Sequence, residues 1–144
     1  MQQFTENYDT LLIGIEMSRE TLYLRINKRV DIMLGHGLFN EVKHLVEQGF
    51  EASQSMQAIG YKELVPVIKG NISMENAVEK LKQHSRQYAK RQLTWFKNKM
   101  NVHWLNKERM SLQMMLDEIT TQINKRSSNH DCKRKHPRPS TREL

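Results

Sequence analysis

Apolar positions along the chain follow two different periods, and each period predicts a different kind of element. Residues 11–15 read Leu-Leu-Ile-Gly-Ile, a short unbroken run typical of a strand buried on both faces of a parallel sheet. Residues 101–105 alternate and are β-prone, so we expect a second short strand there. A buried parallel strand needs neighbouring strands and covering helices, and the chain has too few strands to supply them. The pattern therefore predicts a fragment of a larger α/β core.

Helical periodicity dominates the rest of the chain. Ser18 and Ser73 stand where helix N-caps are expected, and glycines follow several of the predicted helix ends. Pro66 is expected to interrupt the third helix, and residues 50–57 form a polar connection before it. The last helix is expected to bury one apolar stripe, namely Leu112, Met115, Leu116, Ile119 and Ile123. The predicted helices cover residues 19–34, 38–48, 61–69, 73–99 and 111–124.

The longest predicted helix, residues 73–99, has one packing face and an opposite face rich in cations and amides. At about 100° per residue, Arg86, Lys90 and Lys97 lie within roughly 40° of each other. Glutamine and threonine side chains lie beside them, and no acidic residue occurs from position 86 to position 99. Such a surface is either a solvated charged face or a groove for a phosphate backbone. The packing face carries Val78, Leu81, Ser85, Tyr88, Gln92 and Phe96.

Arg29 lies inside the apolar stripe of the helix predicted for residues 19–34. On a helical wheel it falls about 20° from Leu22 and about 40° from Met33. A cation on a packed face is costly unless an anion meets it. Arg29 is therefore either a snorkelling or ion-paired side chain, or a guanidinium that binds a phosphate or diphosphate group. Arg25, one turn earlier, is placed either to assist it or to face solvent.

The net charge of +7 is carried mostly by the C-terminal tail. Residues 125–144 hold seven Lys and Arg and two Asp and Glu, so the tail carries +5 and residues 1–124 carry only +2. An anionic partner must therefore be argued from local arrangement rather than from bulk charge. Because the tail is rich in Lys, Arg, Ser and Asn, we expect it to be disordered.

Cysteine usage and hydropathy indicate a cytoplasmic protein without a membrane partner. The lone Cys132 excludes a disulfide framework and fits a reducing compartment. No apolar run approaches the ~20 residues needed for a membrane span, and no signal peptide heads the chain. The sequence also lacks a Gly-Lys-Ser/Thr phosphate loop, a dinucleotide fingerprint, a nucleophile elbow and metal-ligand spacing. These residues alone therefore form neither a complete catalytic apparatus nor a metal site.

Several blocks of sequence, taken in order, resemble one family. They are residues 25–34 (RINKRVDIML), Gly37-Leu38, Glu41-Val42, residues 56–63 (MQAIGYKE), residues 86–96 (RQYAKRQLTWF) and Trp104-Leu105. Together they resemble the C-terminal half of the bacterial tRNA dimethylallyltransferases, the isopentenyl-tRNA transferase family. The resemblance covers about residues 10–107. Each block alone is weak, but the ordered set is specific.

The resemblance implies a fold and a reaction. The family fold is a P-loop, kinase-like α/β core, and this chain would be a mainly α fragment of it, with one or two short parallel strands and about five helices. The implied reaction transfers a dimethylallyl group from dimethylallyl diphosphate to N6 of the adenosine adjacent to the anticodon, assisted by Mg²⁺. Cations must then meet the departing diphosphate, and the adenosine must leave its stack. The implied partners are the prenyl donor and a tRNA anticodon stem-loop, bound by a monomer.

The resemblance also implies roles for residues of this sequence. Arg29 matches a family arginine associated with catalysis and with the donor diphosphate, and Arg25 is its expected helper. Two segments match tRNA-contacting parts of the family, one before Gly60 and one at the end of the long helix. The residues expected at the tRNA are Ser53, Gln54, Ser55, Met56, Gln57, Arg86, Lys90, Arg91, Gln92, Thr94, Trp95 and Lys97. The Mg²⁺ ligands are expected in an N-terminal half that this sequence does not include.

The family's phosphate loop, its general-base aspartate and its helical insertion have no counterpart in this sequence. We therefore expect the isolated chain to be inactive. Residues 1–107 would be the C-terminal part of the prenyltransferase core, residues 108–124 a C-terminal helix and residues 125–144 the basic tail. Two other interpretations stay open. One is a noncatalytic RNA-binding helical module, and the other is a structural helical domain whose charges face solvent.

Overall fold

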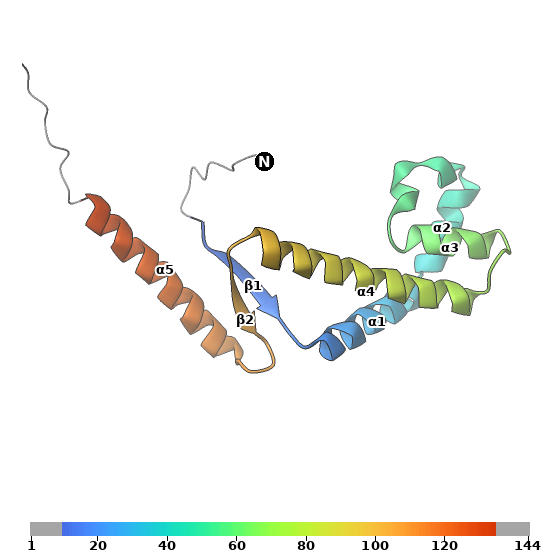
Figure 1. The fold of residues 1–144 in the computed structure, drawn as a ribbon. Coiled ribbons are helices and arrows are strands. Elements are labelled where there is room, and N and C mark those ends of the chain that lie inside the picture. Colours follow the sequence, from blue (N-terminus) through green and yellow to red (C-terminus); the bar gives the residue numbers. More distant parts are fainter. Residues whose placement is uncertain (1–9, 135–144) are drawn as a thin grey trace, which may run out of the picture. The chain divides into compact units, whose positions relative to one another are not determined.

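The computed structural model describes residues 10–134, which fall into two compact units (Figure 1). The helical unit consists of residues 18–100. The strand unit combines residues 10–17 with residues 101–134. Within the described residues, no helix combines the length and the apolar character that crossing a membrane requires.

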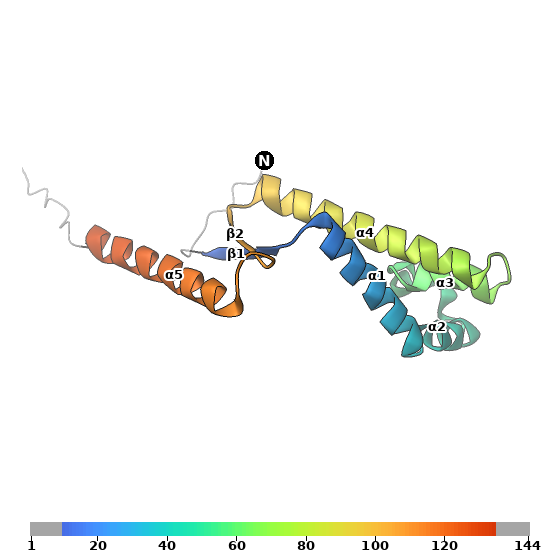
Figure 2. The same cartoon turned by 90° about the horizontal axis from the view of Figure 1, so that it is seen from below.

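The helical unit contains four α-helices and two short 3-10 helices. Its long helices α1 and α4 lie against each other and run in opposite directions, while α3 packs on α4 and α2 packs on α3 (Figures 1 and 2). Each predicted helix is present, with ends that differ by a residue or so. The elements are α1 (Arg19–Gly35), α2 (Leu38–Glu47), η1 (Phe50–Ala52), η2 (Gln54–Gln57), α3 (Tyr61–Ile68) and α4 (Met74–Lys99).

Local signals set the starts of the long helices. Ser18 Oγ accepts a hydrogen bond from the Thr21 backbone N–H at 3.3 Å, and Ser73 Oγ accepts one from the Asn76 N–H at 3.2 Å. Each bond satisfies a backbone donor that has no partner inside the helix. The prediction that both serines cap helices is therefore confirmed.

The core of the helical unit lies where α2, η2, α3 and α4 meet. It is built on Val42, Met56, Leu64 and Ala77, all of them buried. The prediction that Pro66 interrupts the third helix is wrong, because Pro66 lies inside α3. Proline removes one intrahelical donor, and α3 is close to its end at this point. The Pro66 carbonyl oxygen then accepts a hydrogen bond from the Asn71 N–H at 2.9 Å.

The strand unit is built on two parallel strands. Strand β1 (Leu12–Glu16) pairs with β2 (Val102–Asn106), and Gly14 lies opposite Trp104. A Cβ atom at Gly14 would lie 2.5 Å from Trp104 Cε3 and 2.7 Å from Val102 Cγ1, so glycine is needed where the indole crosses the neighbouring strand. The two predicted strands and their parallel direction are confirmed. Burial of the first strand on both faces is not, because Ile15 is 55% exposed.

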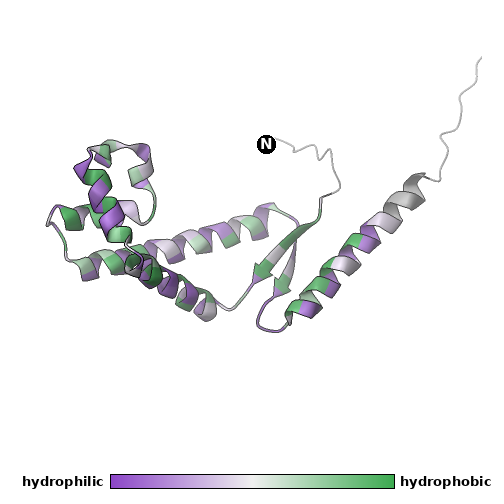
Figure 3. Cartoon of the chain, turned by 180° about the vertical axis from the view of Figure 1, so that it is seen from behind, coloured by the Kyte–Doolittle hydropathy of each residue, from purple (hydrophilic) through white to green (hydrophobic). Residues whose placement is uncertain are grey.

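Helix α5 (Leu112–Arg134) follows β2, and Ser111 Oγ accepts a hydrogen bond from the Met114 N–H at 3.2 Å. The expected disorder from residue 125 is wrong for residues 125–134, which continue α5. No glycine or proline interrupts this stretch, so nothing in it opposes a helix. The expected burial of the apolar stripe is also wrong for Leu112, Leu116 and Ile123, whereas Met115 and Ile119 are half-buried. Leu112 is 70% exposed and Ile123 is 51% exposed, and apolar positions alternate with polar ones along the helix (Figure 3). The remainder of the expected tail, residues 135–144, lies outside the described residues.

Candidate functional site

A cavity of about 630 Å³ opens in the helical unit between α1, the segment after η2, and α4. Its walls are mostly apolar, and one cation, Arg29, stands among them. The remaining side chains at the cavity are Ile26, Val30, Met33, Gln57, Ala58, Ile59, Leu81, Ser85 and Tyr88. A space of this kind suits a ligand that has an apolar body and an anionic end.

Arg29 lies at the cavity, but its side chain is exposed rather than packed. The expectation of an inward guanidinium is therefore wrong in detail, because the face of α1 that carries Arg29 borders an open space. The structure shows no hydrogen bond or ion pair from the Arg29 side chain to any other described residue, so Arg29 is not salt-bridged within this part of the chain. Arg25, one turn earlier on α1, is exposed and does not line the cavity.

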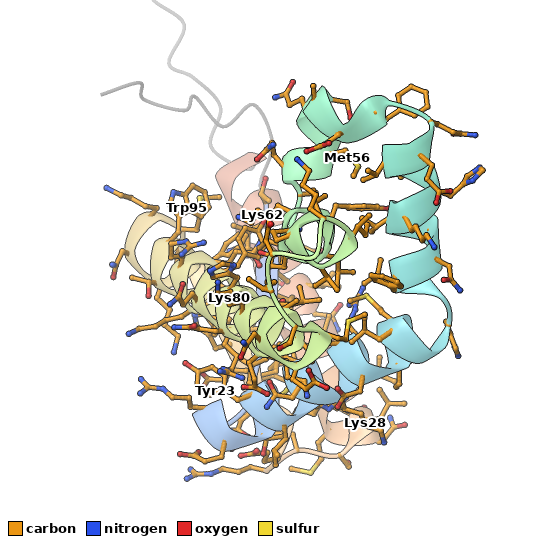
Figure 4. The ribbon with its side chains drawn as sticks, turned by 90° about the vertical axis from the view of Figure 1, so that its right-hand side faces the viewer. Tyr23, Lys28, Met56, Lys62, Lys80 and Trp95 are labelled. Atoms are coloured by element: carbon orange, nitrogen blue, oxygen red, sulfur yellow. The ribbon has the colours of Figure 1, made fainter. Side chains whose placement is uncertain are left out.

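A second hollow of about 490 Å³ runs along the C-terminal half of α4. Trp95, labelled in Figure 4, is 52% exposed there, and its ring meets Phe96 edge-on at 5.1 Å between centroids. The guanidinium of Arg91 lies 6.0 Å from the centre of the Tyr88 ring. We name the residues that line this hollow the α4 surface: Gln87, Lys90, Arg91, Thr94, Trp95, Asn98 and Lys99.

Four of the residues expected at the tRNA belong to the α4 surface, namely Lys90, Arg91, Thr94 and Trp95. Gln92 and Lys97 are exposed on the same helix but do not line the hollow. The expectation that Gln92 faces the packed side therefore fails at this end of α4.

Arg86 departs from the predicted cationic face. Its Nη1 donates a hydrogen bond to Asn27 Oδ1 at 2.8 Å, and its guanidinium lies 5.9 Å from the centre of the Tyr23 ring. One turn away, Lys82 Nζ lies 2.8 Å from Asp31 Oδ1. Both contacts join α4 to α1. Arg86 thus belongs to the joint between α1 and α4. Lys90 lies on the exposed side of α4, apart from Arg86.

The segment expected to contact tRNA before Gly60 forms η2 and the turn that follows it. Gln54, Ser55 and Gln57 are exposed, and the Oγ atoms of Ser53 and Ser55 lie 3.0 Å apart. Met56 is 2% exposed and belongs to the core (Figure 4). The Met56 side chain therefore packs the fold and cannot serve as a surface contact, whereas its neighbours in the segment can.

A buried polar cluster at the start of α3 was not predicted from the sequence. The Glu63 carboxylate accepts a hydrogen bond from the Gly60 N–H at 2.8 Å, and His84 Nδ1 lies 2.6 Å from its other oxygen. The bond from the Gly60 N–H to Glu63 is one half of a capping box, but a glycine at the N-cap has no side chain, so the usual sequence signature of that motif is missing here. His84 lies 21 positions from Glu63, and no local pattern links the two.

A side-chain hydrogen bond from Tyr61 connects α3 to α2 next to this cluster. Its hydroxyl donates a hydrogen bond to Glu41 Oε1 at 2.5 Å. That bond raises the pKa of Tyr61 above its ordinary value of 10.0, and burial and the negative charge of Glu41 raise it further. The contact thus depends on a protonated phenol.

In the strand unit, His103 of β2 is paired with α5. Its Nε2 lies 3.1 Å from Glu118 Oε1 on α5. A hydrogen bond donated by Gln122 lowers the pKa of Glu118; burial opposes this, and the nearby His103 assists it. Among residues 10–128, whose side chains the structure describes, no group of three or more His, Cys, Asp or Glu is placed to hold a metal ion.

A family model described as IPP transferase matches residues 1–99 of the chain. A tRNA dimethylallyltransferase of Staphylococcus epidermidis is 99% identical over all 144 residues, and one of Staphylococcus haemolyticus is 83% identical over the same span. The chain covers 43% of the length of each of these relatives. The chain therefore spans less than half of the length of these relatives.

Two solved structures resemble the described fold. The crystal structure of a tRNA delta(2)-isopentenylpyrophosphate transferase from Staphylococcus epidermidis has a TM-score of 0.79 and 99% identity, over 85% of this chain and 40% of that one. That of the full-length tRNA isopentenylpyrophosphate transferase from Bacillus halodurans has a TM-score of 0.82 and 41% identity, over 92% of this chain and 44% of that one. The arrangement of helices and strands described above is thus also found in solved structures.

Proposed function

The chain belongs to the IPP transferase family, as its sequence blocks predicted, and we propose that it forms part of a tRNA dimethylallyltransferase. The reaction proposed is transfer of a dimethylallyl group to N6 of the adenosine adjacent to the tRNA anticodon. The bond from the donor's C1 to the diphosphate oxygen breaks, and diphosphate leaves. A bond from C1 to N6 forms, and N6 loses a proton to the family's general-base aspartate, which has no counterpart in this sequence. The enzyme must therefore bind an anionic leaving group and a folded RNA.

The observation that carries this proposal is the pairing of an open guanidinium with an apolar cavity. The Arg29 side chain makes no hydrogen bond or ion pair to another described residue, and the walls around it are mostly apolar. Dimethylallyl diphosphate has the matching form, with a short hydrocarbon and a dense negative charge. An arginine meets phosphate oxygens with two parallel N–H donors and remains charged throughout the reaction. In this proposal Arg29 binds the diphosphate as its charge develops, and Arg25 adds positive charge one turn away.

The tRNA is proposed to lie on the α4 surface. Lys90, Arg91 and Lys97 would neutralise phosphates, Thr94 and Gln92 would donate or accept hydrogen bonds, and Trp95 would stack on a base. The half-buried Ser53 and the exposed Gln54, Ser55 and Gln57 of the 53–57 segment would meet the same RNA. Arg86 lies on α4 but bonds to Asn27 of α1, so it supports this surface rather than belonging to it.

Mg²⁺ is proposed, from the family resemblance, to be held by residues of the N-terminal half that this sequence does not include. When bound, the ion would neutralise diphosphate charge. The acidic residues nearest to Arg29 along α1 do not form a site: Glu20 is exposed at the first turn and Asp31 pairs with Lys82. We also propose, from the family resemblance, that the enzyme is a cytoplasmic monomer.

The proposal is tested in the full-length Staphylococcus epidermidis relative, with this chain replacing the segment that it matches. Arg29→Ala should lower the rate of prenyl transfer by roughly 100-fold and leave the affinity for tRNA nearly unchanged. Lys28→Ala, at the neighbouring exposed position of α1, is the matched control. An Arg29→Ala enzyme that turns over at the parental rate would contradict the role of Arg29. An inactive parent that still binds RNA would favour the noncatalytic RNA-binding module.

A further inference from the structure

Glu63 is the one charged side chain buried among the residues that the structure describes, with 4% of its surface exposed. Removing a carboxylate from water is costly unless it is hydrogen-bonded or paired. An apolar residue at this position of α3 would avoid that cost. The presence of a carboxylate inside the helical unit therefore calls for a role beyond filling space.

Both oxygens of the Glu63 carboxylate are engaged. Oε2 accepts the hydrogen bond of the Gly60 backbone N–H at 2.8 Å, and Oε1 lies 2.6 Å from His84 Nδ1, which donates to it when it carries the proton. Lys62 Nζ lies 4.0 Å from Oε1 and is more exposed. The carboxylate thus joins two places on the chain, the turn before α3 and the middle of α4.

Gly60 connects this cluster to the cavity that Arg29 lines. Its φ of +105° lies in a region that side chains with a Cβ rarely adopt, so the turn needs support to hold this shape. The three residues before it, Gln57, Ala58 and Ile59, form one wall of the cavity that contains Arg29. On α4, His84 lies next to Ser85, which lines the same cavity. Glu63 therefore holds the 57–59 wall against α4.

We propose that Glu63 and His84 are positioning residues that fix residues 53–59 for the tRNA. This inference rests on the proposed function, because the 53–57 segment is part of the proposed tRNA-binding surface. Neither side chain needs to touch the RNA. Their effect is to fix the positions of the exposed side chains of η2, Gln57 included, relative to α4. Helix α4 carries the other part of the proposed tRNA-binding surface.

A purely structural capping box makes a different prediction. If Glu63 only satisfied the Gly60 N–H, the loss of His84 would change stability at most, since His84 bonds to the other oxygen of Glu63 and not to Gly60. If the cluster instead fixes the position of residues 53–59, the loss of His84 should raise KM for tRNA without changing the other kinetic constants. His84 is partly exposed, so its replacement is less damaging to folding than replacement of Glu63.

The test uses the same full-length relative carrying this chain. His84→Ala should raise KM for tRNA by about five- to tenfold, with KM for dimethylallyl diphosphate and kcat unchanged. His84→Asn should restore the parental KM, because its amide nitrogen can donate to the carboxylate from the place of Nδ1. The matched control is Tyr61→Phe, which removes the bond from α3 to Glu41 without touching the turn, and it should leave KM for tRNA unchanged.

The inference is overturned by any of three results. These are an unchanged KM for tRNA in His84→Ala, the same defect in His84→Asn as in His84→Ala, or an equal defect in Tyr61→Phe. A parent enzyme that transfers no prenyl group is a separate outcome, because it contradicts the proposed function itself.

Discussion

Arg86 of α4 donates a hydrogen bond from Nη1 to Oδ1 of Asn27 of α1 at 2.8 Å. The same guanidinium stands 5.9 Å from the centre of the Tyr23 ring, within the range of a cation–π interaction. Lys82 and Asp31 repeat the connection one turn along both helices. Since Arg29 lies on α1 and the α4 surface lies on α4, this joint sets the distance between the two proposed substrate-binding regions.

Replacing Arg86 by alanine should therefore weaken the fold. We expect the free energy of unfolding to fall by about 1–2 kcal/mol, from the loss of a charged hydrogen bond and of the contact with Tyr23. Urea unfolding of the 144-residue chain measures this change. Lys90→Ala is the control, because Lys90 is exposed on the open side. It should leave stability unchanged and reduce the salt slope of RNA binding by about one. Equal unfolding free energies for the two variants would contradict the stabilising role of Arg86 in the joint between α1 and α4.

Gly14 should not tolerate a larger side chain. A Cβ atom there would lie 2.5 Å from the Trp104 ring, so Gly14→Ala must displace the indole or separate β1 from β2. The expected loss is roughly 1–3 kcal/mol, as for other overpacked sites. A change in the near-UV circular dichroism of Trp104 should accompany it.

Gly35 supplies the control for Gly14. It is the last residue of α1, and no heavy atom lies within 4 Å of a Cβ built there. Gly35→Ala should therefore stabilise the chain slightly, by about 0.5 kcal/mol, through the unfolded state. Destabilisation by Gly35→Ala as large as that by Gly14→Ala would mean that the indole contact is not the cause.

Tyr61 should make stability fall at high pH. Because its folded-state pKa is raised above 10.0, chiefly by the hydrogen bond to Glu41, its contribution is complete below that value. It is lost as pH rises through the folded pKa, since an ionised phenol cannot donate and repels Glu41. Urea unfolding at about pH 8 and about pH 11 should show a smaller decline for Tyr61→Phe than for the parent.

A matched tyrosine controls for general alkaline effects. Tyr88 makes no hydrogen bond through its hydroxyl to any described residue, so Tyr88→Phe should decline with pH as the parent does. If Tyr61→Phe and the parent also decline equally, the contact with Glu41 does not stabilise the fold.

Local signals predicted the elements, and the errors arose where a distant segment decides the outcome. Ser18 and Ser73 were identified as caps because each bond lies within one helical turn. A helical wheel grouped Arg86 with Lys90, but it cannot show that α1 crosses α4 at Arg86. The stripe that contains Leu112 predicted a face to be buried, and a stripe does not specify what covers it.

The candidate site was predicted in the same uneven way. Arg29 was singled out because a cation in an apolar stripe is unusual, and this signal is local. Met56 carried no periodic signal of burial, because 3-10 turns lack the spacing of a helix or a strand. The contact between Glu63 and His84 joins residues 21 positions apart, and it depends on how α3 packs on α4.

Trp95 should distinguish base stacking from charge neutralisation on the α4 surface. It is half-exposed and lines the same hollow as Lys90 and Thr94, so a base could stack on its ring. Trp95→Ala should weaken tRNA binding by about 1–3 kcal/mol, roughly 5- to 150-fold in Kd, with an unchanged salt slope. Lys90→Ala should instead lower the slope, and Trp95→Phe should retain most of the affinity. Leu24→Ala, which removes an exposed apolar side chain from α1, controls for surface hydrophobicity. If Trp95→Ala changes the salt slope and leaves affinity at low salt intact, the indole does not stack on the RNA.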